Sequence, residues 1–132
     1  MGHEVYDFRN PGTGGPPIDG HDTGFSWREI DEDWERWTGE KYIEALSHPY
    51  AEVGFKADFD AMKLADTFVL VQPCGRSAHL EMGWACGVGA ETIMMLGDDI
   101  EPELMVKMCD HICLGLGEVL ELFELLNGDD DD

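Results

Sequence analysis

The segment covering residues 65–96 constrains the fold more than any other part of the chain. An apolar run typical of a β-strand, residues 67–72, breaks at Pro73-Cys-Gly75 and is followed by a helical segment. A second apolar run covers residues 92–96. Strand, turn, helix and strand in so few residues predict one parallel βαβ unit. Because open α/β sheets bind ligands at the carboxyl ends of their strands, we expect the chemistry in the turn after the first run.

The rest of the chain predicts further strands interleaved with helices. Strand candidates cover residues 4–8 and 110–114. Helical spacing predicts helices over residues 27–37, 39–47, 50–65, 103–108 and 117–126. Ser26 is expected to cap the helix over 27–37, and Pro102 to open the helix over 103–108. Asn127-Gly128 is expected to form the C-cap of the helix over 117–126. We therefore expect a three-layer α/β/α sandwich of the flavodoxin-like or Rossmann-like kind, with a parallel sheet of about four to five strands.

The length of 132 residues is that of one domain, which we assign to residues 1–128. The closing acidic residues, 129–132, are expected to be a disordered tail. A Gly/Pro-rich loop covers residues 12–24, and a mobile cover over a site and a plain connector are both compatible with its length. It is not a P-loop, because Pro16-Pro17 stands where Gly-Lys-Ser/Thr is required.

Charge and hydropathy limit the partners. The formal net charge is −21, with 29 acidic residues against eight Lys and Arg, which argues against binding to nucleic acid or to anionic lipid. A solubilising surface, adaptation to high salt and imitation of nucleic acid are all compatible with this acidity. The sequence has no apolar stretch near the roughly 20 residues of a membrane span and no signal pattern at Met1, so we expect a cytoplasmic protein without membrane contact.

Four cysteines occur without a C-x-x-C pair, so we expect reduced thiols. Cys109, His111 and Cys113 would share one face of the last predicted strand. No fourth ligand accompanies them, and we therefore predict no metal site.

Glu81 is the candidate catalytic residue. Ser77 is a suitable N-cap for the helix after the turn, which would place Glu81 in the first helical turn, where the backbone amides favour an ionised carboxylate. An ionised carboxylate acts as a nucleophile or a base. The same amides, with Gly75 and the charge of Arg76, predict a small anion or polyol site beside it.

The sequence Gly75-Arg-Ser-Ala-His-Leu-Glu81-Met-Gly-Trp-Ala, placed after Ala65-Asp66 and a strand, resembles the signature of the nucleoside 2-deoxyribosyltransferase superfamily. In that family the Glu of a Glu-x-Gly-Tyr/Trp-Ala motif is the nucleophile, and Glu81 is the matching residue. The superfamily includes deoxynucleoside 5-monophosphate N-glycosidases, in which an Asp lies eight positions before the Asp that opens the strand. Asp58 and Asp66 have that spacing.

The resemblance implies roles for further residues. Asp58 would be a second catalytic carboxylate that assists protonation of the leaving base. The implied substrate-binding residues are Tyr6, Asp7, Arg9 and Asn10 after the first strand and Gly75, Arg76 and Ser77 after the second, the latter three at the 5-prime end of the substrate. Family members form dimers or larger assemblies with shared sites, so a homo-oligomer is expected.

The implied reaction is retaining cleavage of an N-glycosidic bond of a nucleoside or nucleoside monophosphate through a covalent glycosyl-Glu81 intermediate, without metal or organic cofactor. Transfer to another base and transfer to water both remain open. Two other classes of function also remain open: an inert pocket that sequesters a nucleotide derivative, and an acidic interaction protein that imitates nucleic acid.

Overall fold

The computed structural model describes residue 5, residues 25–98 and residues 100–128. Two compact units are formed, Met1–Leu64 and Ala65–Asp132. The described elements of the first unit are η1 (Trp27–Glu29), η2 (Trp34–Arg36), α1 (Gly39–Leu46) and α2 (Pro49–Leu64). Those of the second are β1 (Thr67–Val71), α3 (Arg76–Gly87), β2 (Glu91–Met95), η3 (Leu104–Met108), β3 (His111–Cys113) and α4 (Leu116–Gly128).

Both α-helices of the first unit begin at residues whose side chains accept hydrogen bonds from the first turn. Thr38 Oγ1 accepts from the backbone N–H of Lys41 at 3.2 Å at the start of α1. His48 Nδ1 accepts from the N–H of Tyr50 at 3.0 Å, just before α2. Pro49 opens α2, where a missing N–H costs nothing. The two helices predicted over residues 39–47 and 50–65 are confirmed.

The helix predicted over residues 27–37 is wrong, because the structure has only the short 3-10 turns η1 and η2 there. Ser26 does cap η1, accepting from the N–H of Arg28 at 3.3 Å. The side chain of Asp31 then accepts from the backbone N–H of Asp33 and from Nε1 of Trp37, both at 2.9 Å. Side-chain bonds of this kind compete with helical backbone bonds, which explains why helical spacing did not produce a continuous helix.

The second unit contains a three-stranded parallel sheet in the order β1-β2-β3. Thr67 of β1 lies opposite Glu91 of β2, and Ile93 of β2 lies opposite His111 of β3. The predicted βαβ unit, formed by β1, α3 and β2, is therefore confirmed, as is the mixed α/β class. The strand predicted over residues 4–8 and the loop over 12–24 lie outside the described residues.

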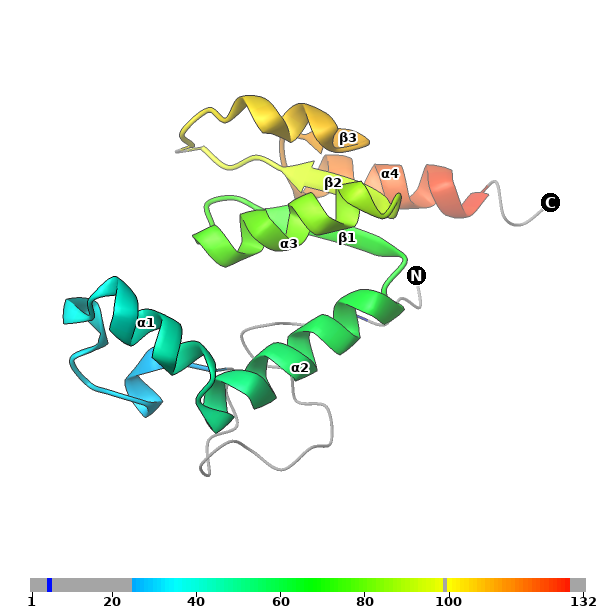
Figure 1. Cartoon of the computed structure of the whole chain (residues 1–132). Helices are drawn as coiled ribbons and strands as arrows, with labels where there is room; N and C mark the ends of the chain where they lie inside the picture. The colour runs from blue at the N-terminus through cyan, green and yellow to red at the C-terminus, as the bar shows by residue number, and fades with distance from the viewer. Residues whose placement is uncertain (1–4, 6–24, 99, 129–132) are drawn as a thin grey trace. The chain divides into compact units, whose positions relative to one another are not determined.

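The core of the second unit lies on both faces of β2. Helices α3 and α4 flank the sheet (Figure 1). Met94 packs with Leu70 of β1 and with Met82 and Ala85 of α3. Its neighbour Ile93 points to the other face, where it packs with Cys113 of β3 and Val119 of α4. Because successive side chains of β2 point to opposite faces of the sheet, α3 packs on one face of this strand and α4 on the other. All three buried side chains of β2, Thr92 included, are at most 1% exposed.

Two predicted boundaries in the second unit are wrong. Residues 104–108 form a 3-10 helix, and Glu103 caps it by accepting from the N–H of Met105 at 3.4 Å, so Pro102 precedes the cap and is not a helical position. Helix α4 continues through Asn127 and Gly128, which therefore do not form the predicted C-cap. Within the described part of the chain, no helix is long and apolar enough to cross a membrane.

The starts of β2 and β3 are joined by reciprocal bonds between Thr92 and Asp110. Asp110 Oδ2 accepts from the N–H of Thr92 at 3.0 Å and from its hydroxyl at 3.3 Å, while the N–H of Asp110 donates to Thr92 Oγ1 at 2.9 Å. Replacing Asp110 by alanine leaves two donors of the buried Thr92 without this acceptor. We expect Asp110→Ala to lower the free energy of unfolding by about 1–3 kcal/mol, measured by urea denaturation.

The matched variant for this prediction is Asp110→Asn, which keeps a side-chain oxygen that can accept from Thr92. It should lose less stability than Asp110→Ala. Equal losses for the two variants would show that the hydrogen bonds to Thr92 are not the cause.

Candidate functional site

The candidate site is built at the carboxyl end of β1, where the chain turns into α3. The N–H of Gln72 donates to the carbonyl of Met95 at 2.9 Å, which carries the strand pairing one residue past β1. The Gln72-Pro73 peptide bond is cis, and the chain then enters α3 at Arg76 with Gly75 as N-cap. This strand, turn and helix place the predicted residues Gly75, Arg76, Ser77 and Glu81 in one segment.

Ser77 is not the N-cap that its residue type predicts. The helix begins at Arg76, so Ser77 lies inside its first turn and Gly75 occupies the cap position without a side chain to accept a bond. The side chains of Arg76 and Ser77 are exposed. Their backbone N–H groups belong to the first turn of a 12-residue helix, where such groups lack intrahelical acceptors.

Because α3 starts at Arg76, Glu81 lies in the second turn and not in the first, and the first turn holds no acidic residue. The helix dipole therefore stabilises its charge less than predicted, since that effect falls off within the first turn. The Glu81 side chain is half-buried. Burial, followed by the negative charge of Glu81, raises the pKa of the Cys74 thiol.

Three residues at this turn were missed by the sequence reasoning: Gln72, Cys74 and His79. His79 Nδ1 lies 3.0 Å from the carbonyl oxygen of Gly75, and its Nε2 lies 3.4 Å from Nε2 of Gln72. A carbonyl only accepts, so Nδ1 is the donor in the first contact, and Nε2 is left to accept from the Gln72 amide. The Gln72 amide also donates to Sδ of Met94 at 3.5 Å. The signals for these contacts were the place of Gln72 at a strand end and the four-residue spacing of Gly75 and His79.

Cys74 is poorly suited to act as the nucleophile of this site. Its Sγ lies 3.8 Å from Nδ1 of His79, a pairing that resembles a thiol and its base. However, Nδ1 is the protonated nitrogen, and burial together with Glu81 raises the pKa of the thiol. Only the thiolate is strongly nucleophilic. The carboxylate of Glu81 is therefore the better candidate.

The other residues of the Glu-x-Gly-Trp-Ala segment have packing roles. Met82 is 6% exposed and Ala85 is fully buried, both against β1 and β2. The Trp84 ring makes an edge contact with Phe68 of β1 at 6.2 Å between ring centroids. These contacts fix the rotation of α3 on the sheet, and with it the direction in which Glu81 points.

Gly97, two residues after β2, lies close to the same turn. A Cβ atom at this position would lie 2.9 Å from the carbonyl oxygen of Gln72 and 3.6 Å from Cδ of Pro73. Since the first neighbour is backbone, Gly97→Ala requires the end of β1 to shift. We expect a loss of about 1–3 kcal/mol in the free energy of unfolding, measured by urea denaturation. Gly117→Ala in α4 is the control, because a Cβ there meets no atom within 4 Å, and stability equal to that control would contradict the prediction.

The remaining predicted site residues belong to other segments of the chain. Asp58 lies half-buried on α2, in the first unit. Asp66 immediately precedes β1, and its carbonyl accepts from the N–H of Glu91 at 3.1 Å. Tyr6, Asp7, Arg9 and Asn10 lie outside the described residues. The roles of Asp58 and of these four residues stay predictions.

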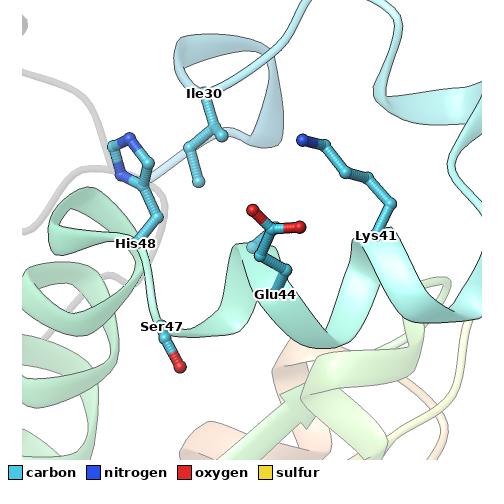
Figure 2. A pocket seen from close by; sticks show the side chains of 6 residues that line it. Ile30, Lys41, Glu44, Ser47 and His48 are labelled. Carbon is cyan, nitrogen blue, oxygen red and sulfur yellow. The ribbon is translucent and has the colours of Figure 1, made fainter.

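The first unit has a small open hollow of about 220 Å³. Figure 2 shows the side chains of Lys41 and Glu44 rising from α1 on the side of Ile30. The lining residues are Ile30, Lys41, Glu44, Ala45, Ser47 and His48. None of them is a predicted site residue, and the hollow contains no carboxylate pair of the kind that glycosidic cleavage requires.

The shared face predicted for Cys109, His111 and Cys113 is wrong for Cys109, whereas His111 and Cys113 do share one face of β3. β3 begins at His111, so Cys109 lies before the strand and packs against the core cluster on the α3 face of β2. Cys113 packs on the other face with Ile93. His111 is instead bonded through Nε2 to Oε1 of Glu91 at 2.6 Å. In the described residues, no group of three His, Cys, Asp or Glu side chains is arranged to hold a metal ion.

Comparison of this chain with models of protein families, with curated proteins and with solved structures gave no match.

Proposed function

We propose that this protein cleaves the N-glycosidic bond of a nucleoside or nucleoside monophosphate through a covalent intermediate on Glu81. The observation that carries this proposal is the place of Glu81, half-buried in the second turn of α3, the helix that directly follows β1 and its turn. That turn follows a parallel strand, and the carboxyl ends of such strands are where open α/β sheets bind substrates.

In the proposed reaction, a Glu81 carboxylate oxygen forms a bond to the anomeric carbon of the sugar. The bond from that carbon to the base nitrogen breaks, its electron pair goes to the base, and an acid protonates the base as it leaves. We assign the acid role to Asp58. Water or a second base then attacks the anomeric carbon and releases Glu81. Each step has an oxocarbenium-like transition state, which a carboxylate stabilises without a metal or organic cofactor.

Further support comes from the surroundings of the carboxylate. The first-turn amides of α3 and the charge of Arg76 favour an anionic group such as a 5-prime phosphate, which Gly75 and Ser77 would contact. Gln72 is held by His79 and Met94 at the strand end, so its amide can orient a sugar or base. Tyr6, Asp7, Arg9 and Asn10 would complete the substrate site.

The proposal extends to the architecture of the whole chain. The fold would be a three-layer sandwich in which the strand predicted over residues 4–8 joins the sheet, to give four to five strands. This arrangement would bring Arg9 and Asn10 to the same edge as Gly75, because the carboxyl ends of parallel strands share one edge. We further propose a cytoplasmic homo-oligomer.

The test is to incubate the full chain with a panel of deoxynucleosides and deoxynucleoside monophosphates, with and without a second free base. Chromatography follows release and exchange of the base. We expect turnover of at least one substrate. Exchange identifies a transferase, and release alone identifies a hydrolase. Absence of turnover with every substrate would contradict the enzyme proposal, and ligand binding under those conditions would favour a sequestering pocket.

A further inference from the structure

Two cysteines meet at the amino ends of β2 and β3, on the α3 face of the sheet. Cys86 is the penultimate residue of α3, and Cys109 is the C-cap residue of η3. Both are partly buried and pack against the cluster that contains Met94. Neither residue belongs to the turn between β1 and α3 or to the first two turns of α3, where the candidate site lies.

Both cysteines lie beside the buried Thr92, whose hydroxyl is a shared neighbour. Cys86 Sγ lies 3.8 Å from Thr92 Oγ1. Cys109 directly precedes Asp110, whose backbone N–H donates to the same Thr92 Oγ1 at 2.9 Å. The hydroxyl of Thr92 is itself fixed by its reciprocal bonds with Asp110. Both cysteines thus adjoin the same buried hydroxyl in the reduced protein.

We propose that Cys86 and Cys109 form a reversible intramolecular disulfide, which makes this pair a redox modification site. Each cysteine lies at the end of a helical element, where small backbone shifts can bring the sulfurs to bonding distance. The bond would tie the end of α3 to the chain just before β3.

The oxidant is a low-molecular-weight disulfide. One protein thiolate attacks it, forming a mixed disulfide and releasing one small thiol. The second protein thiolate then attacks the protein sulfur of the mixed disulfide and releases the other small thiol. In balance, two protein thiols are oxidised to one disulfide, one small disulfide is reduced to two thiols, and the two protons pass to those thiols.

The other two cysteines are placed differently. Cys74 lies in the turn after β1, next to His79. Cys113 packs with Ile93 and Val119 on the opposite face of β2. Burial is the main cause that raises the pKa of Cys109 to about 11, and the electrostatic effect of Cys86 adds to it. Since exchange requires a thiolate, the reaction should be slow at neutral pH and faster at pH 8.5.

The test treats the native full chain with excess glutathione disulfide at pH 8.5, stops the exchange with acid, and measures the intact mass. The expected product has lost two hydrogen atoms. Trypsin, which cleaves after Lys63, Arg76 and Lys107, places the cysteines in three peptides. Cys74 lies in peptide 64–76 and Cys86 in peptide 77–107, while Cys109 and Cys113 share peptide 108–132. A second cleavage before Asp110 separates Cys109 from Cys113, so the bonded pair is identified directly.

Single variants complete the design. Cys86→Ser and Cys109→Ser should each abolish the loss of two hydrogen atoms and leave a glutathione adduct on the remaining partner. Cys74→Ser should still form the same bond. Three results would overturn the proposal. The first is a glutathione adduct on both Cys86 and Cys109 without a bond between them, and the second is a disulfide that involves Cys74 or Cys113. The third is that neither Cys86 nor Cys109 is oxidised in the native chain. The wild-type measurement decides the question even if a variant fails to fold.

Discussion

Replacing Glu81 by alanine should lower the rate of N-glycosidic cleavage by more than about 1,000-fold, because the variant lacks the atom that bonds to the anomeric carbon. Stability should change by no more than about 1 kcal/mol, since alanine is the best helix former and Glu81 is only half-buried. The measurement is base release on the best substrate of the panel, with urea denaturation of both proteins alongside.

Two controls separate a nucleophile from a merely structural glutamate. Glu121→Ala removes an exposed carboxylate from α4 and should leave the rate unchanged. Azide added to Glu81→Ala can enter the space of the missing carboxylate and attack the anomeric carbon. It should restore base release and yield a glycosyl azide of inverted configuration, whereas wild-type turnover retains configuration.

A substrate whose glycosyl-Glu81 intermediate is hydrolysed slowly should let that intermediate accumulate on the wild-type protein. Peptide mass analysis should then find the sugar on the peptide that contains Glu81. A sugar found on another residue would move the nucleophile elsewhere. Turnover by Glu81→Ala at the wild-type rate would refute the role of this residue while leaving the reaction class in place.

The second large effect concerns stability. Ile93 is fully buried between β3 and α4, and Ile93→Ala should lower the free energy of unfolding by about 3 kcal/mol. The lost methylene and methyl groups leave a cavity that Cys113 and Val119 cannot fill without shifting, because both are themselves packed. For a chain of this size, we expect the melting temperature to fall by about 10 °C.

The matched control for Ile93→Ala is Val69→Ala. Val69 lies directly opposite Ile93 in the register of β1 and β2, on the same face of the sheet, but its side chain is 39% exposed. Its replacement should cost about 1 kcal/mol or less. Equal losses at the two positions would show that α4 does not cover the sheet over Ile93.

The local pattern was sufficient to predict the elements whose hydrophobic period and breakers agree. The βαβ unit from β1 to β2 was predicted correctly, because a five-residue β-type run and a helical run are separated by a proline and a glycine. Over residues 27–37 the same rule failed. The spacing of the tryptophans is helical, yet Asp31 bonds to Asp33 and Trp37 and divides the segment into two short turns.

At the candidate site, sequence by itself proposed Glu81 as the nucleophile, and it correctly placed that residue after a strand and a glycine-containing turn. Tertiary structure decided how Glu81 is presented. Helix α3 starts at Arg76, which moves Glu81 to the second turn, and Met82, Trp84 and Ala85 set the rotation of the helix against the sheet. The contacts of Gln72 with His79 and Met94, and of Cys86 with Thr92, join residues 6 to 22 positions apart. Local propensity determines which residues form a helix or a strand, but contacts at such separations depend on how the elements pack, and only the folded chain specifies that.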